Sequence, residues 1–185
     1  MARRADRFVS GLVLAGEAAQ RPGSRHARLL RRVLDTARSC RFDQLLIAVG
    51  GAGAAAAASA GLDLAGADVL ADAPHREGWA SSIVEALANL DPRTDVLVLM
   101  LGDQAGMTPG TVQSLLDGMG LAALAACGYA SGRGHPLAIR REAFGELSGL
   151  DGDAGVWDLL ERHPDGVVDV PVAGARTPAV QAARA

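Results

Sequence analysis

The sequence predicts a single α/β domain built around a mostly parallel, doubly wound sheet. Short apolar segments alternate with segments of helical periodicity along most of the chain, which is typical of βαβ architecture. The uninterrupted apolar run at 96–101, V-L-V-L-M-L, is typical of a central strand buried on both faces. With 185 residues, no internal repeat and no linker, the chain is long enough for one such domain and marginal for two.

The first half of the chain supplies three expected strands and three expected helices. The segment 27–40 places Leu30, Val33 and Ala37 on one helical stripe with arginines opposite, which indicates an amphipathic helix. The nearly pure alanine segment 52–60 favours a helix by intrinsic propensity. We therefore expect strands at 8–14, 44–49 and 69–71, and helices at 27–40, 52–60 and 81–90.

The second half continues the alternation with a looser pattern after Gly120. Pro109 suits the first position of a helix, and Pro171 suits an edge strand. The glycine-rich segment Y-A-S-G-R-G-H-P at 129–136 is interpreted as a loop. We expect helices at 109–117, 142–147 and 156–162, and strands at 96–101, 121–127, 137–139 and 167–172. Residues 1–7 and 175–185 are expected to be mobile ends of this single 1–185 domain.

Composition excludes several classes of protein. The chain is 49% hydrophobic and 21% charged, which fits a folded domain, and its net charge of −3 gives no general attraction to nucleic acid. No apolar run is long enough to span a membrane. All 18 basic residues are arginine, so lysine chemistry is excluded.

The cysteines and the N-terminus bear on the location of the protein. Cys40 and Cys127 have no ligand-like spacing, and we interpret them as reduced thiols in a cytoplasmic protein. The basic start and short apolar run resemble a signal peptide, but Ser10 and Gly11 interrupt that run.

Asp103 is the first candidate for a functional residue. It follows the central strand directly, and open α/β sheets bind ligands at the carboxyl ends of their strands. A carboxylate there is suited to binding a hard divalent cation such as Mg²⁺. The alternative is that Asp103 only caps the next turn or helix.

Other polar segments are weaker candidates, each with a structural alternative. Arg21, Arg25 and Arg28 would suit a triphosphate or a solvated helix face. Ser81 and Ser82, after Gly78-Trp79, would suit an anion at a helix start or an ordinary cap. His135, beside Arg133, is as well explained by structure as by function. For Asp153, in a glycine turn that opens a helix, a cap is the default explanation. Gly50, Gly51 and Gly53 lack the further glycine of a dinucleotide fingerprint.

Five stretches together resemble the molybdenum cofactor cytidylyltransferase family, within the MobA-like nucleotidyltransferases. They are G-L-V-L-A-G at Gly11, G-W-A-S-S-I at Gly78, L-G-D-Q at Leu101, G-R-G-H-P at Gly132 and G-D-A-G-V-W-D-L-L at Gly152. The resemblance implies a Rossmann-like three-layer α/β/α sandwich. It also implies Mg²⁺-dependent transfer of a nucleoside monophosphate from CTP or another triphosphate to a pterin phosphate, with release of pyrophosphate.

The resemblance implies roles for particular residues. Asp103 would bind the metal and act in catalysis, with Arg21 and Arg28 holding the triphosphate. The nucleotide would contact Leu14, Ala15, Gly16, Arg21, Gly23 and Gly102, and the acceptor would contact Ser81, Ser82, His135 and Asp153. The expected partners are a nucleoside triphosphate, a phosphorylated pterin-like molecule and a molybdoenzyme, with no nucleic acid and no membrane.

Departures from the family pattern leave two alternatives open. Glu17 replaces a loop glycine, the family's lysine is absent with His26 or Arg28 nearby, and the segment 174–178 lacks both late aspartates. An oxidoreductase of the nicotine blue oxidoreductase type, using NADH or flavin, is one alternative. A catalytically degenerate relative that binds nucleotide or pterin, or assists a molybdoenzyme, is the other.

Overall fold

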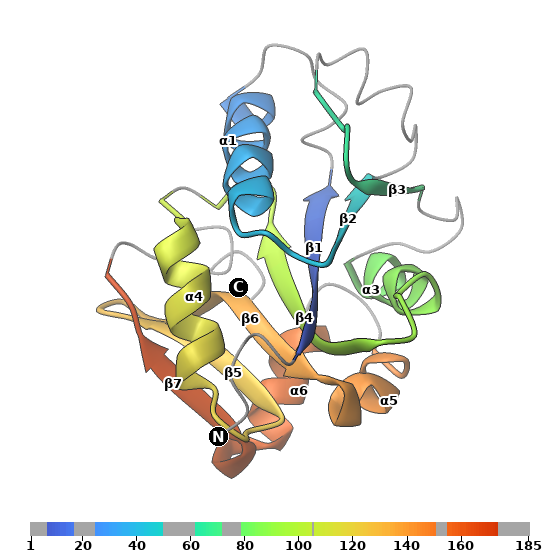
Figure 1. The fold of residues 1–185 in the computed structure, drawn as a ribbon. Coiled ribbons are helices and arrows are strands. Elements are labelled where there is room, and N and C mark those ends of the chain that lie inside the picture. Colours follow the sequence, from blue (N-terminus) through green and yellow to red (C-terminus); the bar gives the residue numbers. More distant parts are fainter. Residues whose placement is uncertain are drawn as a thin grey trace.

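A computed structural model describes residues 7–16, 25–49, 62–71, 79–104, 106–150 and 155–173 of the chain. Strands and helices alternate as the sequence predicts (Figure 1). The strands are β1 (Phe8–Gly16), β2 (Gln44–Val49), β3 (Asp68–Ala71), β4 (Thr94–Leu101), β5 (Leu124–Tyr129), β6 (Gly132–Arg140) and β7 (Val167–Pro171). The helices are α1 (Arg25–Ser39), α3 (Trp79–Ala88), α4 (Pro109–Gly118), α5 (Phe144–Leu147) and α6 (Gly155–Arg162), with 3₁₀ turns η3 (Arg141–Ala143) and η4 (Pro164–Gly166).

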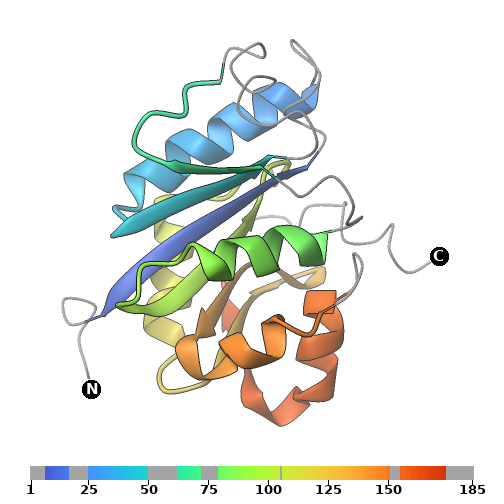
Figure 2. The same cartoon turned by 90° about the vertical axis from the view of Figure 1, so that its right-hand side faces the viewer.

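The strands form one mostly parallel sheet in the order β3-β2-β1-β4-β6-β5-β7. Strand β6 is antiparallel to both of its neighbours, β4 and β5, while every other pairing in the sheet is parallel. Helices α1 and α4 lie on one face, and α3, α5 and α6 lie on the other (Figures 1 and 2). The predicted three-layer α/β/α architecture is therefore confirmed.

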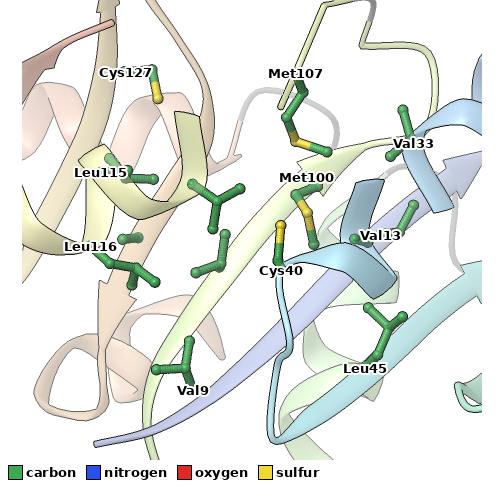
Figure 3. Close-up of a cluster of buried hydrophobic side chains, with 14 of the residues drawn as sticks. Val9, Val13, Val33, Cys40, Leu45, Met100, Met107, Leu115, Leu116 and Cys127 are labelled. Atoms are coloured by element: carbon green, nitrogen blue, oxygen red, sulfur yellow. The ribbon is translucent and has the colours of Figure 1, made fainter. Parts of the chain in front are cut away.

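Strand β4 lies in the middle of the core, which explains its uninterrupted apolar sequence. Successive side chains of a strand point to opposite faces of the sheet. Val96, Val98 and Met100 join the cluster under α1 and α4, part of which Figure 3 shows. Leu97 and Leu99 join the cluster under α3, α5 and α6. Because helices cover both faces, neither side of the strand needs polar residues.

Two of the sequence-based boundaries were wrong. The segment 129–136 is not a loop, because β6 begins at Gly132 and pairs in antiparallel fashion with β5, so that Gly134 lies opposite Cys127. The strand expected at 121–127 begins only at Leu124, and Leu121 is 86% exposed. A glycine-rich local pattern favours a turn, but pairing with a neighbouring strand overrides it.

The remaining expectations agree with the structure to within a few residues or lie outside its described part. Strand β7 is the edge strand next to β5, as Pro171 indicated. The helix expected at 142–147 consists of η3 followed by α5. The helix expected at 52–60 and the expected mobile ends at 1–6 and 175–185 lie outside the described residues. Within the described ranges, no helix combines the length and apolar character that crossing a membrane requires.

Candidate functional site

The carboxyl ends of β1 and β4 meet at a close backbone junction. The Gly102 amide donates to the Leu14 carbonyl oxygen at 2.8 Å, directly after the pairing of Leu14 with Leu101. A Cβ at Gly102 would lie 2.9 Å from Leu30 Cδ1, 3.0 Å from Leu14 O and 3.1 Å from Ala15 Cα. A side chain at this position would crowd the backbone of β1, which favours glycine here. The structure thus brings together Leu14, Ala15 and Gly102, three of the residues expected to bind a nucleotide.

A tight turn after this junction carries Asp103. The Gln104 amide donates to the Leu101 carbonyl oxygen at 3.1 Å, which closes the turn. Asp103 is partly buried, and this burial raises the pKa of its carboxyl group, while a hydrogen bond to its own backbone and the charge of His26 oppose the increase. His26, whose charge acts on this carboxyl group, is in the first turn of α1. A partly desolvated carboxylate of this kind gains from a nearby cation.

The donor set around Asp103 fits a cation that arrives with a nucleotide. The described residues contain no group of three or more His, Cys, Asp or Glu side chains that could hold a metal ion. Mg²⁺ is commonly bound by one or two carboxylates, with water and substrate phosphate oxygens as the remaining ligands. Asp103 therefore suits a Mg²⁺ or Mn²⁺ ion whose other ligands are phosphate oxygens and water.

The other expected nucleotide contacts are placed only in part. Arg28 is exposed in the first turns of α1, the helix that also carries His26. Gly16 ends β1 beside the junction. Arg21 and Gly23 lie outside the described residues, so the structure says nothing of their position.

Three of the four residues expected to contact the acceptor lie around the start of α3. Ser81 and Ser82 are in its first turn, and Ser82 is 7% exposed. Trp79, at the start of the same helix, has its ring centroid 6.4 Å from that of His135. Helix α3 and strand β6 therefore bring Ser81, Ser82 and His135 to one side of the sheet. Asp153 lies outside the described residues.

His135 is buried in β6 and not exposed in a loop. Its side chain is 4% exposed, and its ring packs edge-on against Trp157 of α6 with centroids 5.2 Å apart. Burial penalises the charged imidazolium and lowers the pKa of His135 from 6.5 to about 3. Within the described part of the chain, His135 Nδ1 has no hydrogen-bond partner. The imidazole is therefore a neutral hydrogen-bonding group.

Three further residues surround His135 that the sequence motifs do not identify, namely Gln104, Tyr129 and Trp157. Gln104 Nε2 and the Tyr129 hydroxyl both donate to the His135 carbonyl oxygen, the latter at 2.6 Å. Gln104 is the last residue of L-G-D-Q, and a polar residue directly after Asp103 is itself a signal. Trp157 is one of only two tryptophans in the chain. A rare aromatic residue at the start of an amphipathic helix was the available clue.

The burial of neutral His135 predicts that the folded protein loses stability as the pH falls from 7 toward 4. The unfolded chain binds a proton at this residue near pH 6.5, whereas the folded chain does so only near pH 3. Unfolding therefore takes up a proton between these pH values, and the free energy of unfolding falls by up to about 1.4 kcal/mol per pH unit from this group.

The His135→Phe variant tests this pH dependence, because it keeps an aromatic ring against Trp157 and cannot be protonated. We expect urea unfolding at pH 7, 6 and 5 to give a smaller loss of stability for the variant than for the wild type. If the free energy of unfolding falls equally with pH in the variant and the wild type, the burial of a neutral imidazole is contradicted.

Sequence comparison assigns most of the chain to one family profile. The profile of the MobA-like NTP transferase domain matches residues 11–167. A search of curated protein sequences gives no significant match.

Similar folds occur among solved structures. The crystal structure of Rv0371c from Mycobacterium tuberculosis H37Rv in complex with manganese shares 36% identity, with 92% of this chain and 90% of that chain covered and a TM-score of 0.78. Its homolog from Mycobacterium sp. strain JC1 shares 39% identity over 91% of this chain and 88% of that chain, also with a TM-score of 0.78. The 4-diphosphocytidyl-2C-methyl-D-erythritol synthase of Anaerococcus prevotii DSM 20548, at 13% identity, 90% coverage of each chain and a TM-score of 0.72, shows likeness of fold alone.

Proposed function

The chain belongs to the MobA-like NTP transferase domain family, and from this premise we propose that it is a Mg²⁺-dependent nucleotidyltransferase of the molybdopterin cytidylyltransferase type. An oxygen of the acceptor's phosphate would attack the α-phosphorus of CTP or another triphosphate. The bond from that phosphorus to the bridging oxygen would break, and pyrophosphate would leave. The observation that carries the proposal is the Asp103 carboxylate, which is partly buried directly after the junction of β1 and β4.

The residues at the junction would position the nucleotide. The close approach of Gly102 to Leu14 and Ala15 holds the carboxyl ends of β1 and β4 together beside Asp103, and open α/β sheets bind ligands at such strand ends. Asp103 would hold Mg²⁺, which supplies positive charge to the phosphates when bound. Arg28 and Arg21 would hold the triphosphate through forked guanidinium donors. Enzymes of this reaction class act mainly by positioning and charge stabilisation.

The acceptor would bind on the side of α3 and β6. Helix amides and hydroxyls at Ser81 and Ser82 suit a phosphate group, and neutral His135 would contact the remainder of a pterin-like acceptor. Asp153 would be a further acceptor contact. A molybdopterin acceptor would make a molybdoenzyme the recipient of the product. Cys40 and Cys127 are both buried and form no disulfide bond, which supports a cytoplasmic location in this proposal.

Ligand-dependent thermal unfolding tests the proposed function. We expect CTP with Mg²⁺ to raise the Tm, by roughly 5–10 °C at a ligand concentration of about 100 times Kd, and EDTA to abolish the increase. GTP, ATP, NADH and FMN serve as comparisons. Release of pyrophosphate with molybdopterin as acceptor then tests transfer itself. A Tm increase with NADH or FMN and none with any triphosphate would contradict the proposal and favour the oxidoreductase alternative.

A further inference from the structure

Gln104 joins strands β4 and β6 at the point where their backbones separate. The antiparallel ladder between them pairs Val96 through Leu99 of β4 with β6, and it does not continue in the described residues beyond Leu99. The Gln104 side chain, which is only 4% exposed, lies past the end of that ladder. Its Nε2 donates to the His135 carbonyl oxygen, which also accepts from the Tyr129 hydroxyl. A carboxamide therefore takes the place of main-chain pairing.

The Asp103 turn is consequently fixed on both of its sides. On the β1 side, the Gly102 amide donates to the Leu14 carbonyl oxygen at 2.8 Å. On the β6 side, the fixing contact is the Gln104 side chain with His135. Asp103 lies between these two anchored residues in the sequence, so loss of the second anchor would release the turn that orients its carboxylate.

Two buried polar atoms at the same place have no hydrogen-bond partner within the described residues. They are Gln104 Oε1 and His135 Nδ1. Buried polar side-chain atoms are nearly always paired, so each exception requires an explanation. An amide oxygen can only accept a hydrogen bond, whereas a neutral imidazole nitrogen can accept or donate according to tautomer. Both atoms can therefore accept a hydrogen bond from an N–H or O–H group that the described residues do not supply.

We propose that Gln104 is a positioning residue of the transfer site, whose Nε2 fixes the Asp103 turn against β6 and whose Oε1, with His135 Nδ1, accepts an N–H or O–H group of the acceptor. The inference about the acceptor rests on the proposed nucleotidyltransferase function. The inference about the turn concerns the chain itself and can be measured without any ligand.

Amide hydrogen exchange tests the positioning role in the unliganded protein. The Gln104→Met variant keeps the length of the side chain and removes both hydrogen-bonding groups. We expect exchange of the amides at 102–104 to become at least tenfold faster, with exchange in β2 unchanged. Gln113→Met, on α4, is the matched control and should leave the 102–104 amides as in the wild type. Unchanged exchange at 102–104 in Gln104→Met would overturn the positioning role.

Ligand measurements test the rest of the inference. The affinity for Mn²⁺ in the presence of CTP can be measured from the electron paramagnetic resonance signal of free Mn²⁺. We expect the Kd for Mn²⁺ to rise at least tenfold in Gln104→Met. The KM for molybdopterin should rise at least tenfold. Gln104→Leu, which also removes both hydrogen-bonding groups and adds no charge, should weaken Mn²⁺–CTP binding similarly and serves if Gln104→Met does not fold.

The outcomes separate this inference from the proposed function. The inference would be overturned, and the function would stand, if the wild type binds Mn²⁺–CTP and both Gln104 variants bind it with a Kd within twofold of the wild-type value. The KM for molybdopterin would also be unchanged in that case. A wild type that binds no Mn²⁺–CTP would overturn the function and the acceptor contact together, and hydrogen exchange would then decide the positioning role.

Discussion

Replacing Asp103 by asparagine should lower the rate of Mg²⁺-dependent nucleotidyl transfer by at least about 100-fold. Asparagine keeps the shape of the side chain and one oxygen, but it removes the negative charge that a hard divalent cation requires. Removing groups that only orient the metal ligands lowers metal affinity or activity by about 10–100-fold. Removing the charge of a ligand should therefore lower the activity by at least as much. The measurement is pyrophosphate release at saturating CTP and Mg²⁺.

The same substitution should not destabilise the unliganded protein, although it lowers the reaction rate. Burial raises the pKa of the Asp103 carboxyl group, which means that folding disfavours its charged form near neutral pH. Neutral asparagine avoids this cost, so the Tm without ligand should be unchanged or higher while the Mg²⁺–CTP-dependent increase disappears. Asp165→Asn, which makes the same change at an exposed residue of η4, is the matched control. Retention of the ligand-dependent increase in Asp103→Asn would remove Asp103 from the site.

The position of Asp103 could be predicted because it depends on the pattern of one strand. An apolar run without alternation indicates a strand covered on both faces, and such strands end at the edge of the sheet where ligands bind. The pairing of β1 with β4 is not contained in that pattern, and it comes from the structure. It brings Leu14, Ala15 and Gly102 together, and their role in nucleotide binding is a proposal that rests on the family resemblance.

The surroundings of His135 could not be predicted, because they depend on segments distant in the chain. Its ring contacts Trp79 and Trp157, and its carbonyl oxygen accepts from Gln104 and Tyr129. The glycines beside it favoured a loop, and only the pairing of β6 with β5 makes this segment a strand. A hydrogen bond to a backbone carbonyl also leaves no mark in the sequence of the accepting residue, so the partner of Gln104 could not be identified.

Replacing Gly102 by alanine should destabilise the protein and weaken nucleotide binding together. The added Cβ would lie 3.0 Å from Leu14 O and 3.1 Å from Ala15 Cα, and these backbone atoms cannot move away as a flexible side chain can. The ends of β1 and β4 would have to separate, which lengthens the hydrogen bond from the Gly102 amide. Overpacking of this kind costs about 1–3 kcal/mol, which corresponds to a loss of roughly 2–12 °C in Tm.

The comparison with Gly145→Ala shows whether the close contact at Gly102 is the cause. Gly145 lies in α5 with nothing within 4 Å of an added Cβ, and alanine is favoured over glycine in a helix, so its Tm should be unchanged or slightly higher. For Gly102→Ala, we expect the Kd for CTP with Mg²⁺ to rise at least tenfold even at temperatures where the variant is fully folded. A lower Tm with unchanged CTP affinity would mean that the junction of β1 and β4 stabilises the fold without forming the nucleotide site.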